Sequence, residues 1–150
     1  MNLLLDTNVL IDFIGRKEPH FDNAERIIIA GYYGDAKLWV STQSLKDAYY
    51  VLSNYIDQKR VQRAIRRALN ALSPVALSAE ESTRGLYLEW EDYEDCLISL
   101  CASAVKADYL ITRDKNGFAR SSVPALTPEE WLCFMKEEYN LEYEGIDFPL

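Results

Sequence analysis

Hydrophobic positions along the chain form two patterns that alternate. Short apolar runs, which are typical of strands buried in a parallel sheet, predict strands at 2–6, 37–40, 74–77, 108–112 and 124–126. Apolar residues spaced three and four positions apart predict helices with one buried face at 9–13, 21–33, 42–54, 57–72, 79–90, 92–106 and 129–139. Because strands alternate with helices, we predict an α/β fold whose central parallel sheet is covered by helices on both faces.

This fold class indicates where chemistry belongs. In open parallel sheets the ligand binds beyond the carboxyl ends of the strands. Asp6 ends the first predicted strand, and Asp114 closely follows the strand at 108–112. We therefore expect two carboxylates at the same rim of the sheet.

The composition narrows the class of protein. The chain has 150 residues, and we predict a single domain over 1–150 with an acidic, aromatic C-terminal tail at 141–150. A net charge of −8 argues against binding of nucleic acid by bulk charge. No apolar stretch is long enough to span a membrane, no secretory signal opens the sequence, and the three cysteines are odd in number, so we expect a cytoplasmic protein. A single histidine leaves no His-rich zinc site.

Further acidic residues are candidates for the same rim. Asp95 follows Glu94 in the first turn of a helix that Asp92 can cap. Asp47 lies one turn into helix 42–54, and either that helix is covered on both sides or Asp47 lines a cleft. Carboxylates crowded in a cleft raise one another's pKa or hold a cation, and oxygen-only ligands favour Mg²⁺ or Mn²⁺. The pattern indicates metal-assisted hydrolysis of a phosphodiester.

Five segments carry motif patterns in order along the chain. They are 4–12 (LLDTNVLID), 40–52 (VSTQSLKDAYYVL), 92–98 (DYEDCLI), 109–114 (YLITRD) with Phe118, and 126–130 (LTPEE). Together they resemble the PIN-domain family, and its bacterial VapC-like toxins in particular. The resemblance implies a three-layer α/β/α fold and a Mg²⁺- or Mn²⁺-dependent endoribonuclease, the toxin of a VapBC-type toxin–antitoxin pair. It also implies an RNA substrate cut to 5′-phosphate and 3′-hydroxyl ends, a cognate antitoxin as partner, and a homodimer.

The family's functional residues can be carried over by position. The metal-binding and catalytic acids would be Asp6, Asp47, Asp95 and Asp114. Asn8 and Thr112 would position these acids or a water molecule, and Asp92 and Glu94 would assist them. Arg113, directly before Asp114, is the best single candidate for contacting the scissile phosphate.

Two positions depart from the family's pattern. The second acid is commonly Glu, and this chain has the shorter Asp47 there. Gly117 stands where an acid often precedes the phenylalanine of the fourth motif. The second departure weakens the case for a second metal ion.

Plainer interpretations of the same residues stay open. Asp95 and Glu94 are also what a helix dipole favours in a first turn, and Asp47 is also compatible with a solvated surface. A basic face on helix 57–72 is either an RNA or partner contact or a solvated helix face. Its members are Lys59, Arg60, Arg63, Arg66 and Arg67.

Two other functions compete with the nuclease. A PIN-like module without catalysis would bind RNA or a protein through a vestigial site. A phosphatase or phospho-receiver would use Asp6 as nucleophile, but the phosphatase needs a second Asp where Asn8 stands, and the receiver needs an acid pair at the first strand.

Overall fold

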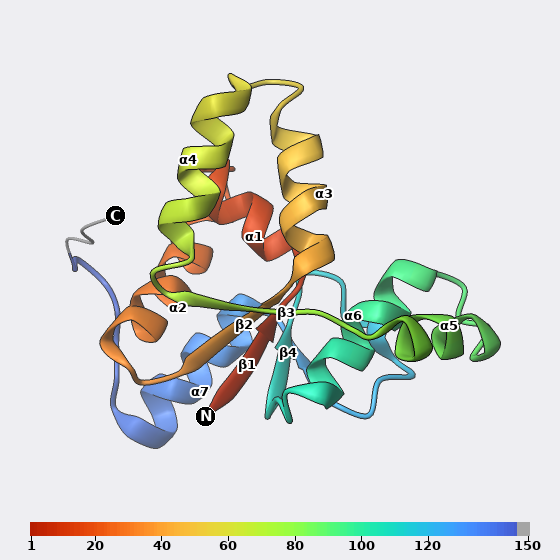
Figure 1. The fold of residues 1–150 in the computed structure, drawn as a ribbon. Helices are drawn as coiled ribbons and strands as arrows, with labels where there is room; N and C mark the ends of the chain where they lie inside the picture. The colour runs from red at the N-terminus through yellow and green to blue at the C-terminus, as the bar shows by residue number, and fades with distance from the viewer. Residues whose placement is uncertain (147–150) are drawn as a thin grey trace.

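The computed structural model describes residues 1–146 and contains strands and helices in the predicted alternation (Figure 1). The strands are β1 (Asn2–Leu5), β2 (Lys37–Ser41), β3 (Leu72–Val75), β4 (Tyr109–Ile111) and β5 (Ala125–Leu126). The helices are α1 (Thr7–Ile14), α2 (Phe21–Tyr33), α3 (Thr42–Leu52), α4 (Gln58–Ala68), α5 (Ala79–Tyr87), α6 (Tyr93–Ala104) and α7 (Pro128–Tyr139), with a short 3-10 helix η1 (Lys115–Phe118).

The strands form one sheet in the order β3-β2-β1-β4-β5, and every neighbouring pair is parallel. Central β1 pairs Leu5 with Val40 of β2 on one side and with Ile111 of β4 on the other. The carboxyl ends of these three strands therefore lie at one edge. The predicted α/β fold, a three-layer α/β/α arrangement around a parallel sheet, is confirmed.

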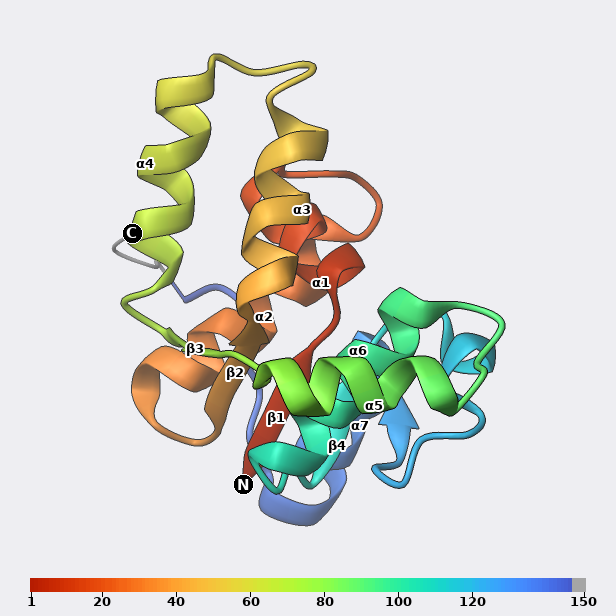
Figure 2. The same ribbon diagram turned by 45° about the vertical axis from the view of Figure 1, so that its right-hand side comes forward.

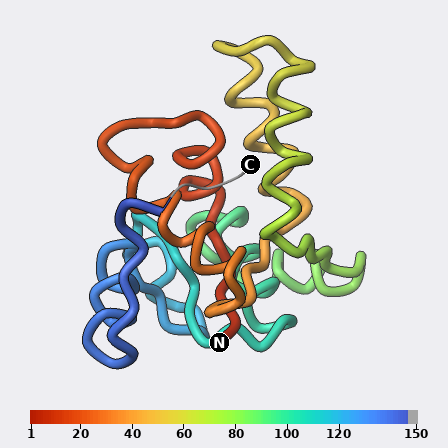
Figure 3. Tube along the Cα trace, turned by 90° about the vertical axis from the view of Figure 1, so that its left-hand side faces the viewer, coloured from red at the N-terminus to blue at the C-terminus, as the bar shows by residue number. Residues whose placement is uncertain are grey.

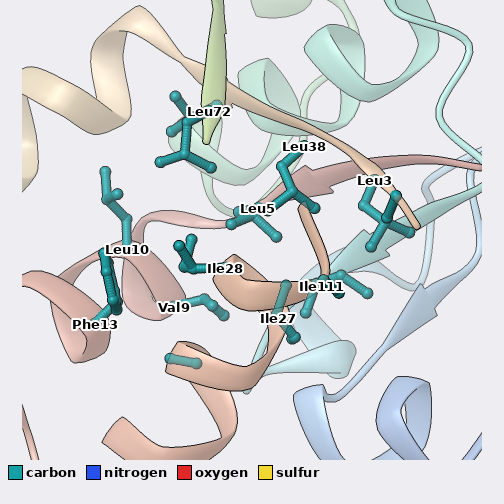
Figure 4. Close-up of a cluster of buried hydrophobic side chains, with 14 of the residues drawn as sticks. Leu3, Leu5, Val9, Leu10, Phe13, Ile27, Ile28, Leu38, Leu72 and Ile111 are labelled. Atoms are coloured by element: carbon teal, nitrogen blue, oxygen red, sulfur yellow. The ribbon is translucent and has the colours of Figure 1, made fainter. Parts of the chain in front are cut away.

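Alternate residues of β1 enter two separate cores, one on each face of the sheet. Leu3 and Leu5 belong to the larger core, which α1, α2 and α7 complete (Figure 4). Leu4 points to the opposite face and packs with Ile98 of α6 and Phe118 of η1. Because both faces are covered, β1 is a continuous apolar run rather than an alternating one.

Helices α3 and α4 lie side by side and project beyond the carboxyl edge of the sheet (Figures 1 and 2). The tube view shows the same two helices as an arm pointing away from the N-terminus (Figure 3). Ser41 caps α3 by accepting the N–H of Gln43 at 3.1 Å, and Asp57 caps α4 by accepting the N–H of Arg60 at 3.0 Å. The arm therefore forms one wall above the strand ends.

The boundary between α4 and β3 corrects the sequence prediction. Residues 57–72 were expected to be helical and 74–77 extended, but α4 ends at Ala68 and β3 begins at Leu72. Leu72 keeps a helical spacing to Leu69, yet it pairs with Leu38 of β2. Pro74 is accommodated because β3 is an edge strand, where a missing donor costs little.

The described part of the C-terminal tail covers the domain. Tyr143 is buried, stacks on Trp131 with ring centroids 6.4 Å apart, and donates its hydroxyl to Asp35 at 3.1 Å. Residues 147–150 of the predicted tail lie outside the described residues. Among residues 1–146, no helix combines the length and hydrophobicity that crossing a bilayer requires.

Candidate active site

Asp6 joins the end of β1 to the start of α1. Its Oδ1 accepts the N–H of Thr7 at 2.6 Å, which makes it the cap of α1. Its Oδ2 accepts the amide of Asn8 and the hydroxyl of Thr112, both at 2.7 Å. Burial, together with the charges of Asp95 and Glu94, raises the pKa of Asp6 to about 6, although the hydrogen bonds from Thr112 and Thr7 act the other way.

Thr112 connects Asp6 to the loop that carries Asp114. This fully buried side chain donates to Asp6 and accepts the N–H of Asp114 at 3.0 Å. Asn8 closes the same network, because its Oδ1 accepts the N–H of Arg113 at 3.3 Å. Asn8 and Thr112 therefore fix how the two strand-end acids face each other.

The N-terminus of α6 brings in three more acids. Asp92 caps the helix by accepting the N–H groups of Glu94 at 2.8 Å and Asp95 at 3.4 Å. Burial and the charges of Asp92, Glu94 and Asp114 raise the pKa of Asp95 to about 6. Burial and the charges of Asp47 and Asp92 also raise the pKa of Glu94. These carboxylates are thus close enough to disfavour one another's ionised form.

Asp47 lines a cleft rather than open surface. A cavity of about 440 Å³ opens between α1, α3 and α6 at the carboxyl edge of the sheet. It is lined by Asp6, Thr7, Asn8, Ile11, Asp47, Tyr50, Val51, Asp92, Glu94 and Asp95. The Asp47 carboxylate also forms an ion pair with Nζ of Lys46 at 2.6 Å, and the positive charge of the lysine partly neutralises it.

Gly117 leaves room beside Asp95 and Asp114. A Cβ built at Gly117 would overlap Oδ2 of Asp95 and lie 3.7 Å from Oδ2 of Asp114. Asp114 caps η1 by accepting the N–H of Asn116 at 3.2 Å. The glycine that departs from the family's pattern therefore lies against the acid cluster.

Arg113 is held by a residue that the sequence analysis did not single out. Its Nε lies 2.7 Å from Oδ2 of Asp12, whose side chain is almost completely buried in α1. Burial raises the pKa of Asp12, while the Arg113 charge opposes the rise. The guanidinium is therefore anchored along one edge. The only signal in the sequence was an acid within the otherwise apolar segment 9–13.

The carboxylate oxygens of the cleft are suitable ligands for a hard divalent cation. Within residues 1–146, no three acidic, histidine or cysteine side chains already converge as a metal cage. The acidic side chains that line the cleft nevertheless offer oxygen ligands, two of them have a pKa near 6, and the space at Gly117 adjoins two of the carboxylates. Mg²⁺ and Mn²⁺ favour such oxygen ligands and retain several waters.

The chain belongs to the PIN-domain family, whose model matches residues 2–116. No curated protein sequence is significantly similar to it. This membership confirms the predicted resemblance and implies nuclease activity.

Solved structures with the same fold include VapBC and VapC proteins. VapBC2 from Rickettsia felis, bound to a fragment of its promoter DNA, has 22% identity and a TM-score of 0.66 over 85% of this chain and 98% of that one. A toxin–antitoxin complex from Klebsiella pneumoniae has 26% identity and a TM-score of 0.61 over 84% and 97%. Mycobacterium tuberculosis VapC20, a toxin that cleaves the sarcin-ricin loop, has 10% identity and a TM-score of 0.64 over 79% and 94%.

Proposed function

We propose that this protein is a Mg²⁺- or Mn²⁺-dependent endoribonuclease and the toxin of a VapBC-type pair. The observation that carries the proposal is the convergence of carboxylates from separate elements on one cleft, with the pKa of Asp6 and of Asp95 raised to about 6. The chain's family membership supports the same activity.

The proposed roles in the site are of two kinds, binding of the cation and orientation of the residues that bind it. Asp6, Asp47, Asp95 and Asp114 would hold the cation, and a bound divalent cation lowers the pKa of water and offsets negative charge on a phosphodiester. Asn8 and Thr112 orient Asp6 through hydrogen bonds of 2.7 Å each. Asp92 orients the first turn of α6, where Glu94 lies beside Asp95 and adds negative charge to the cluster.

Arg113 would bind the phosphate beside the cleft. The contact between its Nε and Asp12 restricts the guanidinium while leaving the side chain 39% exposed. An arginine already held along one edge loses less rotamer freedom when it binds a phosphate oxygen. Cleavage would leave 5′-phosphate and 3′-hydroxyl ends.

The proposed partner is a cognate antitoxin. Structures with the same fold include a toxin–antitoxin complex and a VapBC complex on promoter DNA. A homodimer remains a prediction. The phosphatase alternative is disfavoured because both Asp6 oxygens already accept hydrogen bonds from Thr7, Asn8 and Thr112.

The test is cleavage of a mixed tRNA and mRNA pool with Mn²⁺, with Mg²⁺ and with chelator. We expect metal-dependent cuts that Asp95→Asn weakens more than about 100-fold, because removal of a ligand costs more than removal of a group that orients one. The matched control is Asp22→Asn, since Asp22 is also a first-turn aspartate, in α2 and outside the cleft.

Three results would separate the alternatives. Undiminished cleavage by Asp95→Asn would overturn the assignment of this acid. Cleavage that persists in chelator would exclude a metal-dependent nuclease. No cleavage and no Mn²⁺-dependent rise in melting temperature would favour the non-catalytic binding module, because a bound ion stabilises the folded state in proportion to its occupancy.

A further inference from the structure

Asp47 differs from the other three proposed metal ligands because a cation of the protein itself lies beside it. Nζ of Lys46 is 2.6 Å from Oδ1 of Asp47. Within residues 1–146, this is the only ion pair that any of the four acids forms. One of the four carboxylates is therefore already paired with a positive charge before a metal ion binds.

The helix does not force this contact. Consecutive residues of a helix project about 100° apart, so the pair forms only because the long lysine side chain bends towards Asp47. The side chain of Lys46 is 75% exposed, whereas that of Asp47 is 24% exposed. Holding an exposed lysine in one position costs rotamer freedom, and exposed ion pairs contribute little to stability. The contact between Lys46 and Asp47 can therefore open at little cost.

A second cavity gives the ammonium group room to move. This cavity of about 400 Å³ has Lys46 in its wall and adjoins the acidic cleft, because Asp47 and Glu94 line both. The Lys46 charge also opposes the rise in the pKa of Glu94, so the ammonium lies near both acids. Lys46 can therefore leave Asp47 and still remain at the edge of the site.

We propose that Lys46 is a positioning residue that competes with the metal ion for Asp47. This inference rests on the proposed metal-dependent function and concerns how its site is loaded. The Asp47 carboxylate gains less from a metal ion while its charge is shared with an ammonium group, and that group repels a second cation at short range. The ion pair must therefore open before Asp47 can become a full ligand, and Lys46 lowers the affinity of the site for metal.

The experiment is a calorimetric titration of the whole protein with Mn²⁺ at pH 7.5 in 0.1 M salt, without RNA. Lys46→Gln removes the competing charge, and Lys46→Arg keeps it. The matched control is Lys59→Gln, which changes the net charge by the same amount at an exposed position of α4 that lines neither cavity. Circular dichroism checks that each variant is folded.

Lys46→Gln should bind Mn²⁺ about two- to fivefold more tightly than wild type, the scale set by an exposed ion pair. Lys46→Arg should bind like wild type because a guanidinium also pairs with a carboxylate. Lys59→Gln should bind like wild type because salt screens a charge that lies beyond about 10 Å. In an Asp47→Asn background, Lys46→Gln should no longer change the affinity, since no carboxylate remains to be released.

The failure of this inference differs from the failure of the proposed function. Equal Mn²⁺ affinities in wild type and Lys46→Gln would overturn the competition and leave the nuclease standing. A gain of the same size in Lys59→Gln, or one that persists in the Asp47→Asn background, would also overturn it, because the effect would then be general repulsion. Mn²⁺ affinity that depends on Lys46, in a protein that never cleaves RNA, would sink the nuclease and leave the competition standing.

Discussion

The acidic cleft and the basic face of α4 carry opposite charge and are built in opposite ways. The carboxylates of the cleft come from separate elements and are drawn together by strand ends and helix caps. The cations of α4 come from one helix and share about a third of its circumference at 3.6 residues per turn. They are Lys59, Arg60, Arg63, Arg66 and Arg67, all exposed, and none forms an ion pair within residues 1–146.

The two charge clusters differ in their effect on stability. The acids of the cleft lower the stability of the fold, and the cations of α4 do not. Burial and mutual repulsion raise the pKa of Asp6 and of Asp95, so their ionised forms oppose folding. The cations of α4 remain solvated, and their fields are screened within about 10 Å at 0.1 M salt. The cleft therefore retains repulsion that a cation can relieve, whereas α4 presents charge at little cost to the fold.

The largest effect that would sharpen this contrast is stabilisation by metal. At Mn²⁺ about 100-fold above its Kd, the unfolding free energy at pH 8 should rise by about 2–3 kcal/mol, a shift in Tm of roughly 5–10 °C. At pH 5 the shift should be much smaller, because Asp6 and Asp95, with pKa near 6, then hold protons that the ion must displace. Calorimetry at both pH values measures it, and equal shifts would contradict a clustered site.

A smaller effect should appear without metal when one acid is neutralised. The folded-state pKa of Asp95, about 6, lies above its ordinary value, so the folded state binds the proton more tightly than the unfolded chain does. Its ionisation therefore lowers stability as the pH rises from about 4 to 6. Asp95→Asn removes that cost and should stabilise the protein at pH 7.5 by about 1 kcal/mol. This figure is below the full shift because the side chain is only partly buried and solvent screens it.

Urea unfolding in chelator at two pH values tests this prediction. At pH 4.5 the Asp95→Asn variant should approach the stability of wild type, since both then carry a nearly neutral group at this position. Asp22→Asn, at an exposed position of α2, should show no such pH-dependent gain. A variant that is less stable than wild type at pH 7.5 would mean that Asp95 supports the fold rather than opposing it.

The order of the elements was readable from the sequence because it depends on local patterns. Apolar runs and helical spacings predicted the order of the strands and α-helices, although not the short 3-10 helix η1, and the parallel-sheet rule put Asp6 and Asp114 at one rim. The α4–β3 boundary was wrong because Leu72 fits a helical spacing as well as a strand, and only its pairing with Leu38 decides between them. Local pattern cannot supply a pairing partner that lies far away in the chain.

The parts of the site that the sequence did not give depend on such distant contacts. Asp12 becomes significant only through its contact with Arg113, which lies far away in the chain, in the loop after β4. Tyr50 is one of several tyrosines in the sequence, and only the structure shows that it is exposed and lines the cleft. The roles of Asp6, Asp47, Asp95 and Asp114 remain predictions, although Asp6, Asp47 and Asp95 line one cavity and Asp114 adjoins Asp95.

The smallest expected effect concerns the basic face of α4. Arg63→Gln with Arg66→Gln should change the unfolding free energy by less than about 0.5 kcal/mol, because exposed charges without partners contribute little to a fold. The control is Arg84→Gln with Lys106→Gln, which removes the same charge from exposed positions outside α4.

If both pairs change stability equally, only net charge matters. If the α4 pair alone costs more than 1 kcal/mol, these arginines support the packing of α4, and the contrast with the cleft is wrong. If neither pair has an effect, the charge of α4 can be changed without loss of stability. The acids of the cleft differ, because neutralising one of them changes how the stability of the protein depends on pH.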